Sequence, residues 1–287
     1  MIRTDLASEK EQQLRTGGKS TEGIEKDEFF KGNLHVSRIN VTTEKASELL
    51  EKPQGRYVTV TCENGFDSMP DKVTLYSEAL CCELRRLAGK FRNPLVVGLG
   101  NEAITPDSLG VLVSRKIFAT RHIRRLAPEL YSDKMNEVAV IATGVTGNTG
   151  LESAEIVRAL CEKITPDVVF AIDALACAEI SNLGCTIQLT DTGISPGSGV
   201  KNARAELSEN TLGCKVIAIG MPTVIDMQTA VYQISDAENQ NEKFASMMVT
   251  PRNIDFLVKN GATIIHTALN SLFHPSISPS EIEALVG

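Results

Sequence analysis

The sequence predicts an α/β fold in which helices cover both faces of a mainly parallel sheet. Short runs of apolar, mainly β-branched residues recur along the chain, as in strands that are buried on both faces. Helix-like stretches separate these runs, and this alternation is typical of parallel strands joined by crossover helices. The chain of 287 residues is 42% hydrophobic and 23% charged, which is an ordinary globular composition. The apolar runs are 94–100, 137–142, 167–172, 185–189 and 215–220, and the helical stretches between them are 105–125, 150–163, 174–182 and 222–231.

The amino-terminal part is expected to begin as a flexible arm. Residues 1–33 are polar and rich in Gly, Lys and Glu, and glycines interrupt any periodic pattern. Two segments of alternating polarity follow, 35–42 and 56–62, and predict strands with a short helix between them. Over 71–91, apolar residues recur every three or four positions and predict an amphipathic helix.

The carboxyl-terminal part predicts further helices. Residues 251–286 are expected to form two or three helices, one of them broken by the sequence HPSISPS. No linker rich in Pro, Gly or Ser and no internal repeat interrupts residues 34–287. We therefore expect a single α/β domain over 34–287, preceded by the arm. In such sheets the functional crevice lies beyond the carboxyl ends of the strands.

Composition and charge exclude several classes of protein. The 29 basic and 36 acidic residues give a net charge of −7, which disfavours direct binding of nucleic acid through its phosphates. No apolar run approaches the roughly 20 residues of a membrane helix, and the charged start lacks the apolar core of a secretory signal. The seven cysteines are odd in number, contain no CxxC pair and lie mostly in or beside apolar runs. This usage predicts buried thiols in a reducing cytoplasm rather than a disulfide framework.

Two aspartates are candidates for chemistry because of their places relative to the predicted strands and helices. Asp107 follows Thr105 and Pro106, so it suits either the first turn of a helix or the mouth of the crevice. Asp173 follows the apolar run 167–172, so it suits either a helix cap or a partly desolvated active-site acid. The residues by themselves leave both interpretations open.

A glycine-rich loop over 188–202 is the third candidate. It contains Asp191 and a hydroxyl-rich stretch, together with Gly193, Gly197, Ser198 and Gly199. The spacing of a nucleotide-binding P-loop is absent, so the loop either forms a backbone nest for an anion or oxyanion or merely closes the edge of the sheet. The string VVGLGNEA matches GxGxxA, but the acid expected about 20 residues later is missing, and we expect no dinucleotide site.

The remaining chemistry is that of paired carboxylates. HExxH, GxSxG and Cys/His metal spacings are all absent from the sequence, so zinc-peptidase and serine-hydrolase chemistry have no motif. Two carboxylates held close together do not both ionise, so one stays protonated while the other acts as a base. Such a pair can activate water against an amide. We expect neither a cofactor nor a metal.

Five strings resemble the spore germination protease family: RTDLASE, GLGNEAITPDSLG, FAIDALA, IQLTDTGISPGSGVKNARAELSENTLG and VIAIGMPTVIDM. The resemblance implies an endopeptidase that initiates the degradation of small acid-soluble spore proteins. It also implies a homotetramer in the spore core, made as a self-processing zymogen. The atypical aspartic mechanism of the family places its two catalytic aspartates at Asp107 and Asp173 here. Asp191 is expected to organise its loop.

The resemblance further implies a cleavage site in the arm. Residues 4–9, with the sequence TDLASE, resemble the site that the family cuts in its substrates, an acid followed by an apolar residue, a small residue and then Ser and Glu. We therefore expect self-cleavage between Asp5 and Leu6, which releases a propeptide of residues 1–5. This propeptide is shorter than is usual in the family.

Two alternatives remain. The phosphorylase/hydrolase-like α/β fold implied by the resemblance is shared with hydrogenase-maturation endopeptidases, which bind a metal and are more distantly similar. A metal-dependent peptidase or amidase would use Asp107, Asp173 and optionally Asp191 as ligands. A non-catalytic module would bind a peptide or an anion through its glycine-rich loops and cleave nothing.

Overall fold

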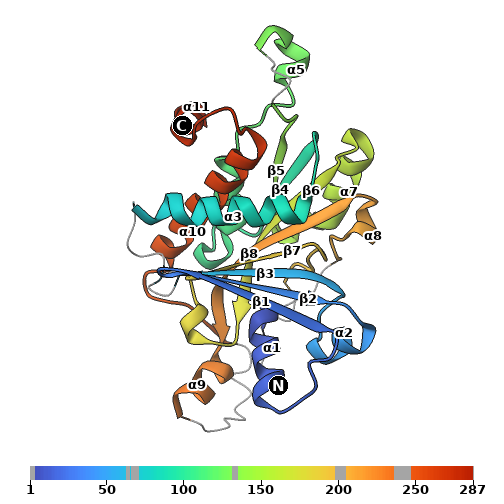
Figure 1. Cartoon of the computed structure of the whole chain (residues 1–287). Helices are drawn as coiled ribbons and strands as arrows, with labels where there is room; N and C mark the ends of the chain where they lie inside the picture. Colours follow the sequence, from blue (N-terminus) through green and yellow to red (C-terminus); the bar gives the residue numbers. More distant parts are fainter. Residues whose placement is uncertain are drawn as a thin grey trace.

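The computed structural model of the chain describes residues 4–62, 65, 71–130, 135–197, 205–235 and 247–286. Its described residues form a nine-stranded sheet in the order β1-β2-β3-β7-β8-β6-β4-β5, with β9 paired to β8 (Figure 1). The strands are β1 (Ile24–Lys31), β2 (Leu34–Val41), β3 (Gly55–Cys62), β4 (Pro94–Leu99), β5 (Ala139–Gly144), β6 (Val168–Cys177), β7 (Thr186–Thr190), β8 (Lys215–Asp226) and β9 (Met248–Val249). The predicted α/β class is confirmed.

The sheet is mixed rather than mainly parallel. Strands β8, β6, β4 and β5 are parallel to their neighbours in that half of the sheet. Strands β1, β2, β3 and β7 pair antiparallel with one another, and β7 joins β8 antiparallel. The apolar run of β7 suits either direction, because burial on both faces determines hydrophobicity and only the pairing partner determines direction.

Helices cover both faces of the sheet. The helices are α1 (Ala7–Thr16), α2 (Glu44–Leu50), α3 (Asp71–Ala88), α4 (Leu109–Arg115), α5 (Ile123–Leu126), α6 (Thr146–Thr149), α7 (Ser153–Ile164), α8 (Glu209–Leu212), α9 (Met227–Ser235), α10 (Ile254–Phe273) and α11 (Pro279–Val286). Helices α3, α4 and α10 share a core with one face of the sheet, whereas α7 and α8 pack on the other face. Helices α1 and α2 share a smaller core with β2 and β3.

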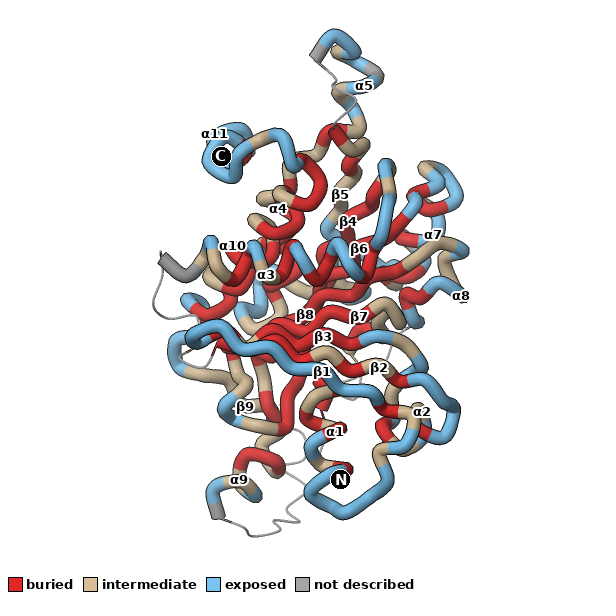
Figure 2. The backbone as a smooth tube through the Cα atoms, in the orientation of Figure 1, coloured by how far each residue is buried: buried red, intermediate tan, exposed pale blue. Residues whose placement is uncertain are grey.

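The alternation of side chains along β6 links the two cores. Phe170 and Ile172 belong to the core that contains α10, whereas Val169 and Ala171 belong to the core that contains α7. Because successive side chains of a strand point to opposite faces, Asp173 lies on the same face as Val169 and Ala171. Figure 2 shows the central strands β3, β7 and β8 as buried and β1 as exposed along the edge of the sheet.

Three of the predicted helices differ from the structure. The stretch 105–125 is divided into a 3-10 turn, η1 (Thr105–Asp107), and the helices α4 and α5. The stretch 174–182 is not a helix, because β6 continues to Cys177 and is followed by the short turn η3 (Ile180–Asn182). Strand β8 likewise continues to Asp226, so α9 begins later than expected. The two strands pair along their whole length, and this pairing keeps the Ala-rich end of β6 extended.

The prediction of a flexible arm over residues 1–33 is also wrong for the described residues. Helix α1 is folded, and β1 pairs with β2 over all eight of its residues. Leu6 and Ala7 are fully buried. Polar composition suggested disorder, but the few apolar side chains of this segment are buried, and its acids Glu9 and Glu11 have partners inside the molecule.

The cysteines fit the prediction of mostly buried thiols rather than a disulfide framework. All seven are free, and five are buried, while Cys82 is exposed and Cys214 is half-buried. None of the helices within the described ranges is both long enough and apolar enough to cross a membrane.

Candidate active site

A cavity of about 600 Å³ opens beyond the end of β4, beside the parts of β6 and β8 that continue past it. Asp107 and Asp173 both line it, together with the end of β4, the middle of β6 and the middle of β8. The glycine-rich loop after β7 forms another wall. This is the crevice that the topology of an open α/β sheet provides, and it brings together two acids that lie 66 positions apart in the sequence.

Asp173 sits in the middle of a buried strand. Its exposed fraction is 6%, and its Oδ1 accepts a hydrogen bond from the backbone N–H of Ala174 at 2.9 Å. In the sheet, Asp173 lies opposite Gly220 of β8, and Gly220 in turn lies opposite Gln188 of β7. Because no helix follows Asp173, the interpretation of this residue as a helix cap is wrong.

Asp107 ends the turn η1 and is half-buried. The residue at the cap position of η1 is Ile104, which makes no side-chain cap bond. The backbone of Asp107 is anchored, since its N–H donates to the Ile104 carbonyl at 2.7 Å and its carbonyl accepts from the Asn101 N–H at 3.0 Å. These bonds fix Asp107 at the rim of the cavity.

Two glycines allow η1 to approach the strands closely. A Cβ on Gly110 would lie 2.4 Å from the carbonyl oxygen of Ile172, the residue before Asp173. A Cβ on Gly100 would lie 2.0 Å from the carbonyl oxygen of Asp107 and 3.1 Å from its Oδ1. The absence of these side chains therefore brings the segment that carries Asp107 against the strand that carries Asp173.

We expect Gly100→Ala to damage the site more than the fold. Gly100 has a φ of 101°, and its substitution combines backbone strain with a direct clash against Asp107. The peptidase activity that the family resemblance implies should fall by about 10²-fold because Asp107 is displaced. The matched control is Gly89→Ala, which also has a positive φ of 73° but has no atom within 4 Å of the added Cβ. Gly89→Ala should lose about 1 kcal/mol of unfolding free energy at full activity, and equal losses of activity in both variants would contradict this role of Gly100.

The described part of the glycine-rich loop follows β7 and lines the cavity. Gly193 and Gly197 line the cavity, and Ser198 and Gly199 lie outside the described residues. Gly193 has a φ of 86°, and a Cβ there would lie 2.3 Å from the carbonyl oxygen of Leu207. Leu207 and Ile194 exchange two backbone hydrogen bonds, of 2.8 and 2.9 Å, which hold the loop against the following segment.

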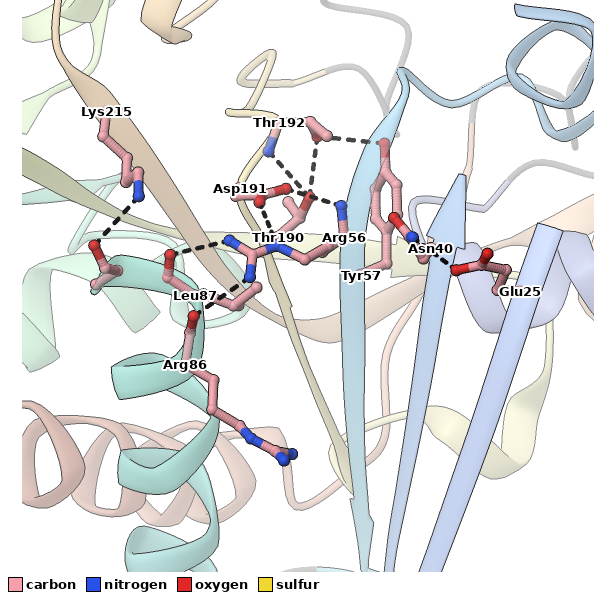
Figure 3. A network of polar contacts seen from close by, with 11 residues as sticks. Glu25, Asn40, Arg56, Tyr57, Arg86, Leu87, Thr190, Asp191, Thr192 and Lys215 are labelled. Carbon is pink, nitrogen blue, oxygen red and sulfur yellow. Dashed lines mark hydrogen bonds and ion pairs between the residues drawn. The ribbon is translucent and has the colours of Figure 1, made fainter. Parts of the chain in front are cut away.

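Asp191 is turned away from the cavity. Its carboxylate accepts from the Arg56 backbone N–H at 2.8 Å and from Arg56 Nε at 2.7 Å (Figure 3). Arg56 also donates to the carbonyl oxygens of Arg86 and Leu87 near the end of α3. Asp191 therefore ties the start of the loop to β3 and α3.

A hydroxyl cluster supports the next residue of the loop. Thr192 Oγ1 bonds to the Tyr57 hydroxyl at 3.2 Å and to Thr190 Oγ1 at 3.0 Å. Burial raises the pKa of Tyr57 to about 12, so this phenol stays protonated at neutral pH.

Among the described residues, no group of three or more His, Cys, Asp or Glu side chains is placed to hold a metal ion.

The segment that precedes α1 docks directly into the cavity. Asp5 lines the cavity, its N–H donates to the Ala176 carbonyl at 2.9 Å, and its Oδ2 accepts from the Ala176 N–H at 2.8 Å. Gln188 Nε2 donates to the carbonyl oxygen of Asp5 at 2.9 Å, and Gln188 Oε1 accepts from the Ala7 N–H at 2.7 Å. Leu6 packs in an apolar cluster with Leu175 and Cys177 of β6. Asp5, on one side of the expected cleavage site, thus lines the same cavity as the two aspartates.

Glu9 anchors the other end of this segment. Its carboxylate accepts from the backbone N–H groups of Ala178 and Glu179, at 2.7 and 3.0 Å, and from Asn182 Nδ2 at 2.6 Å. Glu9 is only 3% exposed. The pKa of the neighbouring Glu179 is raised by its own burial and by the negative charge of Glu9. Residues 5–9 are therefore held at both ends against the extended part of β6.

One lysine lines the cavity among several carboxylates. The described lining residues include the acids Asp5, Asp107 and Asp173, and Lys52 is the basic residue among them. Burial lowers the pKa of the Lys52 ammonium, and the negative charge of Asp5 is the main influence in the opposite direction. Lys52 therefore offsets part of the acidic charge of the cavity.

Sequence reasoning missed two residues of this site, Lys52 and Gln188, and named Glu9 only as part of the string that resembles a cleavage site. Gln188 carried a signal, because it is a polar side chain within the apolar run 185–189. Lys52 lies in a polar stretch where nothing distinguishes it from neighbouring lysines. The role of Glu9 depends on contacts with the residues that follow β6, and that of Lys52 depends on Asp5; these partners are distant in the sequence.

The comparisons with known proteins agree over almost the whole chain. Residues 2–239 match the family model described as germination protease. A germination protease of Caldanaerobacter subterraneus subsp. tengcongensis is 33% identical over 99% of this chain and 98% of its own length. One from Clostridium perfringens strain SM101 is 34% identical over 98% of each chain, and one from Bacillus velezensis is 44% identical over 80% of this chain and 64% of its own. Among solved structures, a NiFe hydrogenase maturation protease of Thermococcus kodakarensis has 16% identity and a TM-score of 0.38, covering 65% of this chain and 98% of that one.

Proposed function

Because this chain belongs to the germination protease family, we propose that it is an endopeptidase that initiates the degradation of small acid-soluble spore proteins during germination. The observation that carries the proposal is the cavity in which Asp107, Asp173 and the docked Asp5 come together. A peptide bond next to an acid is already held there by backbone and side-chain hydrogen bonds. A cavity of this kind suits an extended substrate chain.

In the proposed mechanism, the two aspartates act as base and acid. The ionised member accepts a proton from water, and the water oxygen attacks the carbonyl carbon of the bond to be cleaved. The protonated member donates its proton to the leaving nitrogen. The C–N bond then breaks and yields a carboxylate on one product and an amine on the other. Sharing one proton between the two carboxyls is what lets both roles coexist at one pH.

The same chemistry would convert a zymogen into the active enzyme. We propose that the chain cuts its own Asp5–Leu6 bond and releases residues 1–5. Support comes from the docking of this segment, since Leu6 is fully buried and Asp5 is bonded through both its backbone and its carboxylate. While this segment occupies the cavity, it blocks the approach of another chain. The homotetramer and the location in the spore core are proposed on the family resemblance.

The metal-dependent alternative would need a set of ligands that the described residues do not bring together. Asp191 is paired with Arg56 and does not line the cavity, so the three-aspartate set is not assembled.

A cysteine nucleophile is disfavoured as well. Cys177 is fully buried next to the docked segment, and burial raises the pKa of its thiol, which disfavours the thiolate form.

We therefore expect chelators and thiol-blocking reagents to leave peptidase activity within about twofold of the untreated enzyme. The measurement is the initial rate of substrate cleavage after incubation with each reagent. Loss of activity in chelator that a divalent ion restores would favour the metal-dependent alternative.

The proposed function is tested by incubating the purified chain with a small acid-soluble spore protein and mapping the products by mass spectrometry. We expect one or a few cuts on the carboxyl side of an acidic residue that precedes an apolar and a small residue. The non-catalytic alternative predicts an intact substrate. Cleavage at many unrelated positions would contradict the assignment of this substrate class.

A further inference from the structure

Gln188 is a buried polar side chain that forms hydrogen bonds on both sides of the bond proposed to be cleaved. It is 6% exposed, projects from β7 into the cavity and lies on the face of the sheet that carries Asp173. The core of the sheet does not require an amide here, because its neighbours Ile187 and Leu189 point into the opposite, apolar core. A buried amide without an obligatory structural partner in the sheet calls for another explanation.

The contacts of Gln188 are those of a group that holds a peptide bond. Its Nε2 donates to the carbonyl oxygen of Asp5 at 2.9 Å, and its Oε1 accepts from the N–H of Ala7 at 2.7 Å. The Asp5 carbonyl is the carbonyl of the Asp5–Leu6 bond. The donor therefore points at the oxygen on which negative charge develops when water attacks the neighbouring carbon.

The register of the sheet places Gln188 and Asp173 on the same face, two strands apart. Both lie directly across from Gly220, one on β7 and the other on β6. Neighbouring strands lie about 4.8 Å apart, so the backbones of the two residues are separated by roughly 10 Å. The Leu175 side chain packs over Gly220, because a Cβ on Gly220 would lie 2.5 Å from Leu175 Cγ. Gln188 and Asp173 therefore line the same cavity from different strands.

We propose that Gln188 is a catalytic residue that stabilises the oxyanion of the tetrahedral intermediate, both in self-cleavage and in the cleavage of substrates. This inference rests on the proposed peptidase function. A donor fixed by a strand in a dry cavity is already oriented for the charge, so it costs no reorganisation when the reaction occurs. The bond to Ala7 keeps the amide group from rotating and presents Nε2, not Oε1, to the carbonyl.

The test compares Gln188→Leu and Gln188→Glu with the wild-type chain on a small acid-soluble spore protein. Gln188→Leu removes both hydrogen bonds, whereas an ionised Gln188→Glu keeps an acceptor for Ala7 and replaces the donor with a negative charge. We expect kcat to fall by about 10²- to 10³-fold in both variants while KM changes by less than about fivefold. Thermal unfolding and circular dichroism establish whether each variant is folded. If Gln188→Leu does not fold, the kinetics of Gln188→Glu test the proposal.

Thr186→Val is the matched control, because Thr186 lies on the same strand and the same face but outside the cavity lining. This variant should keep wild-type kcat and KM. An unchanged kcat with a raised KM in the Gln188 variants would show a binding role only and would overturn the inference. So would a Gln188→Glu variant as active as the wild type. If the wild-type chain itself cleaves nothing, it is the proposed function that fails.

Discussion

Asp173→Asn is expected to abolish proteolysis while leaving a folded protein. Asparagine has nearly the shape of aspartate and can keep the contact with the Ala174 N–H, but it can neither accept nor supply the proton that the reaction moves. We expect kcat/KM to fall by about 10²- to 10⁴-fold or more, and the kcat/KM of Asp107→Asn should fall by a similar factor. The measurement is the rate of cleavage of a small acid-soluble spore protein, with circular dichroism and thermal unfolding as tests of folding.

An aspartate at the end of another strand provides the matched control. Asp226 ends β8, and its Oδ1 accepts from the N–H groups of Gln228 and Thr229 at 2.9 and 3.2 Å, so it caps the start of α9. Asparagine is as good a cap as aspartate, and Asp226→Asn should keep full activity. Asp191→Asn should lose less than about tenfold, because this side chain holds the loop through Arg56. Near wild-type cleavage by a folded Asp107→Asn or Asp173→Asn variant would rule out the pair.

The second large effect is expected on self-processing at the Asp5–Leu6 bond. The purified wild-type chain should convert to a form that begins at Leu6, and Asp173→Asn should remain uncut. Leu6→Asp should slow the conversion by at least about 10²-fold. Leu6 is 0% exposed within an apolar cluster, and an ionised carboxylate there loses its hydration without gaining a partner in that cluster. Intact mass and amino-terminal sequencing over time measure the conversion.

Leu6→Met is the control for self-processing, because methionine fills a similar volume and remains apolar. It should be processed at nearly the wild-type rate. A rate that does not depend on protein concentration would indicate that each chain cuts its own segment. A fully active enzyme that still carries residues 1–5 would contradict this activation step.

The sequence predicted the strands and several helices because burial leaves a periodic record. The apolar runs correspond to β4, β5, β6, β7 and β8, and the stretch 150–163 corresponds to α7. It did not predict the direction of β7 or the extension of β6 past Asp173. Both depend on pairing with β8, and no local pattern of polarity reports which strand lies alongside. The same long-range pairing turned an expected helix cap into a residue in the middle of a strand.

The folded amino-terminal segment shows the limit of composition as evidence. Residues 1–33 are as polar as a disordered tail, yet α1 is docked, because Leu6 packs in an apolar cluster and Glu9 meets three donors, two just after the end of β6 and one on η3. None of these partners lies within 160 positions of Glu9 in the sequence. Polarity predicts disorder only when the polar groups have no partners elsewhere in the chain.

By itself, the sequence determined the α/β class, the family resemblance and the choice of Asp107 and Asp173, because these depend on local patterns and on short strings of residues. Only the tertiary structure decided that both acids line one cavity, that Asp191 faces Arg56 and that Gln188 lies beside the Asp5–Leu6 bond. These facts depend on which strands are neighbours and in what register they pair. Register sets the face and the neighbours of every side chain, and it is fixed by the whole sheet rather than by any one segment.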